Sequence, residues 1–261
     1  MSETIGESRY WNALWEQYHV APSIAFCRVP ELEYAARLEL KGRVLDHCCG
    51  DGRFAALAWP GQTMDAGCDI DPGSIEQARQ RGIYKRVDVA DVSVRLPYDD
   101  AAFDLVFDNS AIEHVKAVDS ALAEVARVLA PGGTFAFNVL NHRYFEWWPL
   151  GESAKQSYRD WQPFYHAFSM DEWSKRLERV GLKVTSVEGY FDREAAQALA
   201  TLDCEFSGYY IRKRPSRLVW TYQKLPFVVK NYWHNRLANL DWKTGADEGA
   251  GYFIKAERIN G

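Results

Sequence analysis

Three carboxylates and one glycine-rich turn are the residues of this sequence whose types and spacing could bind a ligand. The stretch VLDHCCGDGRF places Asp46 at the end of an apolar run and sets Gly50 and Gly52 two residues apart. Asp69 ends a second predicted strand, 19 residues beyond Gly50, and Asp91 follows a third. A carboxylate at such a place can accept hydrogen bonds from both hydroxyls of a ribose, and glycines allow the backbone to approach a ligand closely.

The charge of these residues favours a nucleoside without phosphates. A P-loop would need Gly-Lys-Ser/Thr after the turn, and a dinucleotide fingerprint would need a third glycine where this chain has Ala55. A polyphosphate would meet three acids with only Arg53 in support. We therefore expect a nucleoside that carries a positive charge.

The adjacent cysteines Cys48 and Cys49 raise the question of a metal or redox centre. A zinc site needs further cysteines or histidines at ligand spacing, and only His47 is near in the sequence. We interpret the pair as small, polarisable residues in a tight turn and expect no metal. The five cysteines are odd in number and scattered, which predicts reduced thiols and a cytoplasmic location.

Composition sets the outer limits of the interpretation. The chain has 261 residues, 47% of them hydrophobic, which allows one large α/β domain with an insertion. Its net charge of −5 argues against a nucleic acid as partner. No stretch approaches the roughly 18 apolar residues that a membrane-spanning helix needs, and the polar N-terminus does not resemble a secretory signal.

Strand and helix patterns alternate between residues 30 and 190, which predicts a parallel α/β sheet. A strand, a glycine turn and a helix in succession bring backbone N–H groups to the carboxyl edge of such a sheet. Strands are expected at residues 43–46, 64–69, 84–89, 103–107, 134–140, 182–188 and 251–259. Helices are expected at residues 31–40, 72–81, 113–129 and 169–181, and directly after the glycine turn.

Four motifs, in this order and spacing, resemble the class I S-adenosylmethionine-dependent methyltransferases, particularly the methyltransferase domain 11 group. They are VLDHCCGDGR at 44–53, GCDIDPGSIEQAR at 67–79, ADVSVRLPYDDAAFDLVFDNSAIEHV at 90–115 and EVARVLAPGGTFAFNV at 124–139. The resemblance covers roughly residues 40–190 and the final strand. It implies a Rossmann-like seven-stranded sheet whose last strand is antiparallel, with helices on both faces, and S-adenosylmethionine as cofactor.

The resemblance also implies roles for individual residues. Asp46 and the Gly50–Gly52 turn would hold the methionine end of the cofactor, Asp69 the ribose and Asp91 the adenine, while residues 109–111 would line the passage to the acceptor. This chain departs from the family at Cys48, where glycine is usual, although a small thiol can still fit. The expected cofactor-binding residues are Asp46, Cys48, Gly50, Gly52, Asp69, Ile70, Asp91, Val92, Asn109 and Ser110.

Methyl transfer from a sulfonium is an in-line displacement, and a hydroxyl acceptor also needs a base. Open α/β sheets place their sites at the carboxyl ends of strands, so His142 and His166 are base candidates. His114 lies in the Glu-His pair typical of the family and is a third candidate, although shaping of the pocket is its more usual role. Asp108 and Asn109 suggest a variant assisted by a divalent metal, but no second acid is clearly placed to complete an oxygen ligand set.

The chain is expected to have four parts. Residues 1–30 form a helical lid or a helix packed on the sheet, since Trp11 and Trp15 have helical spacing. Residues 31–190 form the cofactor-binding core, 191–250 an acceptor-binding insertion, and 251–261 the final core strand.

The insertion is aromatic and basic, and it suggests the acceptor. Residues 211–243 carry a net charge of +7 and leave −12 for the rest of the chain. Four alternatives explain this basic segment: an anionic or glycan acceptor, weak contact with an anionic membrane surface, RNA, and a plain solvated basic face. The acidic remainder of the chain disfavours RNA. The expected acceptor-binding residues are Tyr144, Trp147, Trp148, Trp161, Arg212, Arg214 and Trp233.

The sequence therefore predicts a methyltransferase that acts on a small molecule, preferably on a hydroxyl of a glycan or acidic sugar-like compound. Methylation of a quinone, lipid or secondary metabolite at carbon, nitrogen or oxygen is one alternative. A catalytically silent, cofactor-binding scaffold is another.

Overall fold

The computed structural model describes residues 3–18, 21–207, 224 and 226–259. The chain divides into two compact units, which are described separately. The sheet unit consists of Tyr34–Leu140, Tyr165–Glu188 and Tyr252–Gly261. The helical unit consists of Met1–Glu33, Asn141–Phe164 and Gly189–Gly251. None of the helices in the described ranges has the length and hydropathy required to cross a membrane.

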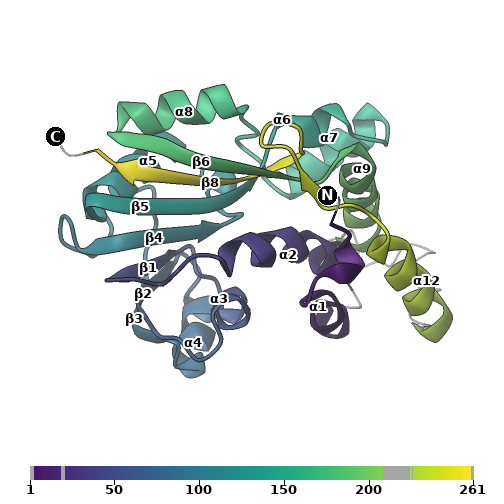
Figure 1. Cartoon of the computed structure of the whole chain (residues 1–261), viewed down its shortest axis with the longest axis horizontal. Coiled ribbons are helices and arrows are strands. Elements are labelled where there is room, and N and C mark those ends of the chain that lie inside the picture. The colour runs from purple at the N-terminus through teal and green to yellow at the C-terminus, as the bar shows by residue number, and fades with distance from the viewer. Residues whose placement is uncertain (1–2, 19–20, 208–223, 225, 260–261) are drawn as a thin grey trace. The chain divides into compact units, whose positions relative to one another are not determined.

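A mixed sheet forms the centre of the fold (Figure 1), as the sequence predicts. The strand order is β3-β2-β1-β4-β5-β8-β6-β7, with β1 to β5 parallel and the final strand, β8, antiparallel to its neighbours. The strands are β1 (Val44–His47), β2 (Met64–Asp69), β3 (Tyr84–Val89), β4 (Phe103–Asn109), β5 (Leu129–Leu140), β6 (Leu182–Tyr190), β7 (Lys243–Thr244) and β8 (Gly251–Arg258).

The described residues form eight strands, whereas the sequence predicts seven. The additional strand is β7, which pairs antiparallel with Gly189 and Tyr190 at the end of β6. Two residues are too few to show the alternating pattern by which a strand is recognised in a sequence. The prediction of seven strands was therefore one strand short.

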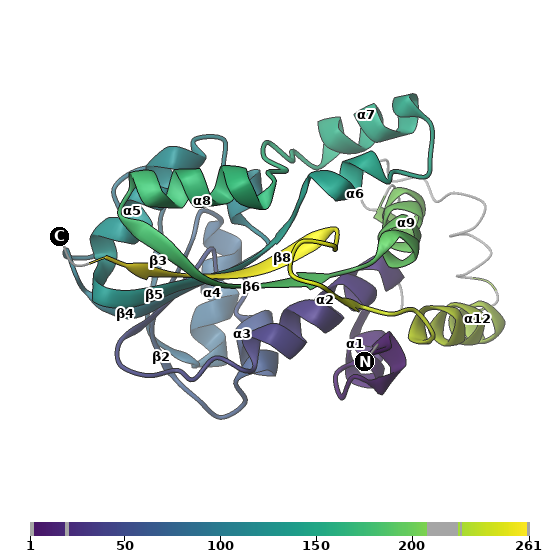
Figure 2. The same cartoon turned by 45° about the horizontal axis from the view of Figure 1, so that its top comes forward.

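Helices cover both faces of the sheet: α3 and α4 lie on one face, and α5 and α8 on the other (Figures 1 and 2). The helix α4 has the predicted bounds because Asp71 caps its first turn, accepting from Ser74 N–H at 2.8 Å, and Gly82 ends it with φ of +68°. The helices of this unit are α3 (Arg53–Ala58), α4 (Pro72–Arg81), α5 (Val118–Val128) and α8 (Met170–Arg179), with a 3-10 turn η2 (Ile112–His114).

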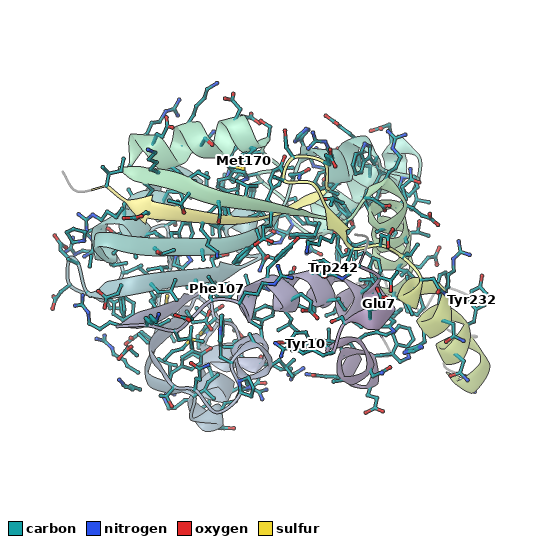
Figure 3. The ribbon with its side chains drawn as sticks, viewed as in Figure 1. Glu7, Tyr10, Phe107, Met170, Tyr232 and Trp242 are labelled. Atoms are coloured by element: carbon teal, nitrogen blue, oxygen red, sulfur yellow. The ribbon has the colours of Figure 1, made fainter. Side chains whose placement is uncertain are left out.

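The apolar side chains of the sheet unit form the core on which the site rests. Phe135 and Phe137 of β5 stack with centroids 4.5 Å apart, and Trp173 of α8 meets Phe137 edge-on at 5.3 Å. On the opposite face, Phe107 (Figure 3) stacks on Phe54 at 5.8 Å. Aromatic burial on both faces holds β1, β4 and β5 as a rigid platform.

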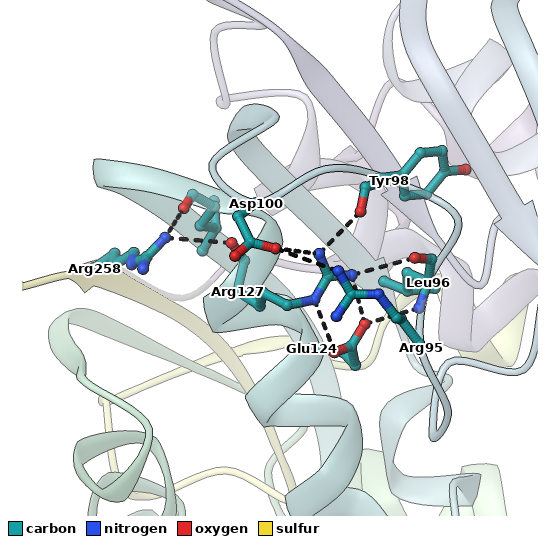
Figure 4. A network of polar contacts seen from close by, with 8 residues as sticks. Arg95, Leu96, Tyr98, Asp100, Glu124, Arg127 and Arg258 are labelled. Carbon is teal, nitrogen blue, oxygen red and sulfur yellow. Dashed lines mark hydrogen bonds and ion pairs between the residues drawn. The ribbon is translucent and has the colours of Figure 1, made fainter.

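A network centred on Arg127 ties the segment between β3 and β4 to α5 (Figure 4). The guanidinium donates to the carboxylates of Glu124 and Asp100 and to the backbone carbonyl oxygens of Leu96 and Tyr98. Five donors in a fixed planar fork can serve several acceptors at once. The segment between Asp91 and β4 is thus anchored to α5 at residues 96–100.

The helical unit joins segments that are far apart in the sequence. Thr4 and Asp241 form a β-bridge, and the N–H of Ile5 donates to the carbonyl of Leu240 at 2.9 Å. Its described helices are α1 (Trp11–Tyr18), α2 (Pro22–Ala35, whose last two residues lie in the sheet unit), α6 (His142–Glu146), α7 (Glu152–Trp161), α9 (Arg193–Leu202) and α12 (Pro226–Ala238), with the short turns η1 (Ile5–Glu7) and η3 (Asp203–Ser207).

Two tryptophans of α1 pack on this unit's C-terminal helix. Trp11 and Trp15 are buried, and the His234 ring of α12 stacks on Trp11 with centroids 5.2 Å apart. Trp242 (Figure 3) is 1% exposed. The N-terminal segment and the segment 191–250 therefore share one packed unit, and their roles as lid and acceptor-binding insertion stay predictions.

We expect Phe137→Ala to lower the free energy of unfolding by about 3–5 kcal/mol, because it removes a fully buried ring from between Phe135 and Trp173. Urea unfolding followed by tryptophan fluorescence measures the change. Val94→Ala is the control, since Val94 is 60% exposed and should stay within about 0.5 kcal/mol of wild type. An equal loss of unfolding free energy in the two variants would contradict this packing of Phe137.

Candidate active site

The turn after β1 adopts a left-handed backbone at three positions. Cys48, Gly50 and Gly52 have φ of +56°, +54° and +74°. The N–H of Gly50 donates to Asp69 Oδ2 at 2.9 Å, and the N–H of Cys49 donates to the carbonyl of Cys68 at 2.8 Å. A Cβ placed on Gly50 would meet nothing within 4 Å, so one side of the turn is open to a ligand. β2 therefore holds the turn from one side and leaves the other free.

Asp46 lies beneath this turn and is only 5% exposed. Its Oδ2 accepts a hydrogen bond of 2.5 Å from the hydroxyl of Tyr84 on β3. Burial raises the pKa of Asp46 to about 7; the Tyr84 hydrogen bond opposes this, and the charges of Asp108 and Asp69 add to it. A buried carboxyl with two acidic neighbours is a favourable place for a positively charged group.

Tyr84 also explains why glycine is needed at two positions near the turn. A Cβ on Gly52 would come within 3.0 Å of the Tyr84 ring, and a Cβ on Gly67 within 3.1 Å of it. Tyr84 is not among the residues predicted from the sequence. A tyrosine at the start of a strand gives no sign that its hydroxyl reaches a carboxylate two strands away.

Asp69 and Asp91 both shape the backbone where their strands end. Asp69 Oδ1 accepts from the N–H of Asp71 at 2.9 Å, and Asp91 Oδ1 accepts from the N–H and the hydroxyl of Ser93 at 2.9 and 2.7 Å. A carboxylate has about four lone-pair sites, so each can still accept from a ligand. Beside Asp69, the apolar side chain of Ile70 is 65% exposed. Ile70 lies between Asp69 and Asp71 in the chain, and an exposed apolar side chain of this kind can pack on the flat face of a base.

A buried histidine–aspartate pair joins β1 to β4. His47 and Asp108 stand opposite each other in the parallel ladder, both are fully buried, and His47 Nδ1 lies 2.7 Å from Asp108 Oδ2. Asp108 Oδ1 accepts from the N–H groups of Ala111 and Ile112, each at 3.2 Å. The pair thus fastens the segment after β4 to the strand that carries the glycine turn.

The thiol of Cys48 completes a cluster with this pair. Ligand atoms of His47, Cys48 and Asp108 lie within 4.8 Å of one another, which is close enough for a metal ion. Both oxygens of Asp108 already accept hydrogen bonds, so the pair and the two backbone donors account for the arrangement. The sequence prediction considered only His47 as a metal-ligand neighbour of the cysteines, because Asp108 is 60 residues from Cys48. All five cysteines are free thiols.

Residues 45–137 match the family model described as "Methyltransferase domain". A probable S-adenosylmethionine-dependent methyltransferase from Mycolicibacterium smegmatis is 30% identical over 192 residues, which cover 71% of this chain and 70% of that protein. The chain belongs to the S-adenosylmethionine-dependent methyltransferases.

Two further matches agree with this assignment. A malonyl-[acyl-carrier protein] O-methyltransferase from Salmonella typhimurium is 27% identical to the methyltransferase over 146 residues, which cover 50% of this chain and 58% of that protein. A solved Thermotoga maritima structure, described as a possible histamine N-methyltransferase, has a TM-score of 0.61 at 19% identity, over 97% of this chain and 98% of that one. At this identity the structural match shows the fold alone.

The methyltransferase uses S-adenosylmethionine as its cofactor. The residues at the carboxyl edge fit that molecule, since Gly50 leaves open space and Asp46 offers a buried carboxyl to a cation. When bound, the cofactor supplies an electrophilic methyl group on a sulfonium.

The predicted histidines lie in different surroundings. The Nε2 of His166 is 3.1 and 3.2 Å from the carbonyl oxygens of Val115 and Lys116, so this nitrogen carries the hydrogen. His114 ends η2 in the same unit, and the N–H of His166 donates to the carbonyl of Glu113 at 3.2 Å. His142 is the first residue of α6 in the helical unit, and its Nδ1 is buried with no partner among the described residues.

Two of the five predicted acceptor-binding aromatics are buried, and the other three are partly buried. Tyr144 and Trp148 are 1% and 9% exposed, in a cluster of rings from the helical unit. Trp161 lies at the edge of that cluster, and the Arg193 guanidinium lies 5.5 Å from the Trp147 ring. Trp233 of α12 is partly buried and meets Tyr232 edge-on.

Two of the predicted acceptor-binding residues, Arg212 and Arg214, lie outside the described residues, as does much of the segment 211–243. Contact between that segment and an acceptor or a membrane surface stays a prediction.

We expect His47→Leu to lower the free energy of unfolding by about 3–5 kcal/mol, because it leaves the Asp108 carboxylate buried without its nearest partner. The double variant His47→Leu/Asp108→Asn should recover most of this loss, since the amide is neutral and its oxygen can still accept from Ala111 and Ile112. Urea unfolding of the three proteins measures the coupling. A single variant as stable as wild type would contradict the pairing.

Proposed function

We propose that the methyltransferase binds S-adenosylmethionine at the carboxyl edge of β1 to β4 and transfers the methyl group to an oxygen of a small molecule. The observation that carries this proposal is the glycine turn itself. Its Gly50 N–H is held by Asp69 while Asp46 lies buried beneath it. In this proposal, one turn thus brings together Asp46, which meets the cationic end of the cofactor, and Asp69, which binds the ribose.

Each residue of the edge has one task in this proposal. Asp46 and the turn from Cys48 to Gly52 hold the methionine end, with the Cys48 thiol where glycine is usual. Asp69 accepts the ribose hydroxyls, Ile70 and Val92 flank the adenine, and Asp91 accepts from its amino group. Asn109 and Ser110 line the passage to the acceptor, held in place by the pair of His47 and Asp108.

The choice of oxygen rests on chemistry and on one relative. The Salmonella typhimurium relative is named as an O-methyltransferase. We favour a hydroxyl or carboxyl oxygen of a small, anionic or glycan-like acceptor, because the segment 191–250 is rich in aromatic and basic residues. A quinone, lipid or secondary metabolite is the second candidate, and it is favoured by the many buried rings of the helical unit.

His142 is the base that we propose for a hydroxyl acceptor. It follows β5 by two residues, and its Nδ1 has no hydrogen-bond partner within the part of the chain that the structure describes. His166 is less suited, because its Nε2 already donates to backbone carbonyl oxygens. The other groups of the site orient the reactants and exclude water.

Asp69→Asn should weaken the binding of S-adenosylmethionine and S-adenosylhomocysteine at least about tenfold, because charge-assisted hydrogen bonds to the ribose are lost. Isothermal titration calorimetry measures both affinities. Asp71→Asn is the matched control: Asp71 caps α4 two residues away, and its substitution should leave the affinities unchanged. Similar affinities in all three proteins would refute the role of Asp69.

His142→Ala should lower the rate of methyl transfer to a hydroxyl acceptor about 100-fold or more. His166→Ala should keep the rate within the same order of magnitude. The assay measures S-adenosylhomocysteine release with phenols, aliphatic carboxylates and acidic sugars as acceptors. An active acceptor whose rate is unaffected by His142→Ala would remove His142 from the mechanism.

A further inference from the structure

We propose that Tyr84 is a positioning residue for the cationic donor: its hydroxyl prepares the Asp46 carboxylate for a positive charge, so that donor binding expels a proton from Asp46. This inference rests on the proposed placement of the donor at Asp46. It adds to that placement a positioning residue, Tyr84, and the release of a proton from Asp46.

The backbone leaves a path for Tyr84 to reach Asp46. Tyr84 begins β3, and β2 lies between β3 and β1. Gly67 stands opposite Asp46 in β2, and a Cβ there would come within 3.1 Å of the Tyr84 ring. On the other side, a Cβ on Gly52 would come within 3.0 Å of the same ring. The ring therefore occupies the space left by two missing side chains, and this fixes the direction of its hydroxyl.

The hydroxyl is a permanent donor. Burial raises the pKa of Tyr84 far above its ordinary value, and the charge of Asp46 and the hydrogen bond between the two groups raise it further. The phenol therefore keeps its proton throughout the range in which Asp46 titrates. Its 2.5 Å hydrogen bond to Asp46 Oδ2 stabilises the ionised carboxylate.

The other ionisable groups around Asp46 act in the opposite direction. Asp108 of β4 and Asp69 at the end of β2 disfavour a negative charge on Asp46, and burial disfavours it most. The Cys49 thiol of the turn stays protonated, because burial and the charge of Asp46 raise its pKa. The Tyr84 hydroxyl is the group that favours ionisation of Asp46 before a cation arrives.

The direction of the pH dependence follows from these contacts. With a pKa of about 7, Asp46 is mostly protonated below pH 7 in the cofactor-free protein. A cation binds the ionised form, so the proton must leave. Affinity for the donor should therefore be nearly constant well above pH 7 and fall about tenfold for each pH unit below it.

The test is calorimetric titration of S-adenosylmethionine between pH 6 and pH 8.5 into wild type, Tyr84→Phe and Tyr98→Phe. Phenylalanine keeps the ring against Gly52 and Gly67 but removes the donor, so the pKa of Asp46 should rise. A rise of one pKa unit would weaken binding relative to wild type about tenfold at pH 6 but only about twofold at pH 8. Titration of the donor's own amine affects both proteins equally, so it cancels in the ratio of their affinities.

Tyr98→Phe is the matched control. Tyr98 is also largely buried, and its hydroxyl donates to the carbonyl of Gly67 at 3.3 Å rather than to Asp46. It should bind the donor with the wild-type pH profile. Circular dichroism checks that all variants are folded.

Proton release provides a measurement that needs no folded Tyr84 variant. Titrations of wild type at pH 6 in two buffers of different ionisation enthalpy should show about one proton released per donor bound. Asp46→Asn should bind the donor weakly and release none.

Three outcomes would overturn the proposal. Binding to wild type with no proton release would exclude the expelled proton. A loss in Tyr84→Phe that is the same at every pH would make Tyr84 merely structural. Failure of wild type to bind the donor at any pH would also overturn the proposed placement of the donor, whereas the first two outcomes leave that placement intact.

Discussion

The buried carboxyl of Asp46 beneath the glycine turn is the interaction on which the rest of the site depends. A carboxylate that is removed from water is costly unless hydrogen bonds or an opposite charge compensate it. The free protein supplies one hydroxyl, from Tyr84, and surrounds the group with two further acids. The backbone above Asp46 bends away through left-handed residues and leaves open space at Gly50. In the proposed function, the cationic donor supplies this compensation.

The same edge of the sheet needs a second buried polar contact to keep its loops in place. The His47–Asp108 pair joins β1 to β4 in direct register, and the second oxygen of Asp108 holds the backbone at Ala111 and Ile112. Ser110, which lies between Asp108 and Ala111 in the chain, adopts a φ of +49°, which a non-glycine residue keeps only when its surroundings determine it. The glycine turn and the segment after β4 are therefore held by one network.

The two units of the chain carry different groups of the predicted residues. The sheet unit carries every predicted cofactor-binding residue, which agrees with the family model matching residues 45–137. The helical unit gathers three distant segments, and its described aromatic residues mostly pack on one another. Its N-terminal residues pair with residues 240–242, so changes in either segment would alter the same unit.

The sequence by itself determined most strands of the sheet and several of its helices, because these follow from local patterns, whereas the helix expected at residues 31–40 lies at Pro22–Ala35. Strands β1, β2 and β4 are largely apolar and helix α4 carries its own caps, so their positions could be predicted within two residues. Strand β5 begins at Leu129, five residues before the predicted strand. Asp46, Asp69 and Asp91 follow consecutive strands, and parallel strands bring such residues to one edge. The order of the four motifs then indicated the family.

Only the tertiary structure decided which distant residues compensate these acids. Tyr84 is 38 residues from Asp46, Asp108 is 61 residues from His47, and the N-terminal bridge joins Thr4 to Asp241. None of these pairs has a local signal, because a hydrogen bond across strands depends on register and on space left by residues such as Gly67. The two-residue strand β7 escaped prediction for a related reason: it exists because β6 offers it an edge, and its own residues carry no strand pattern.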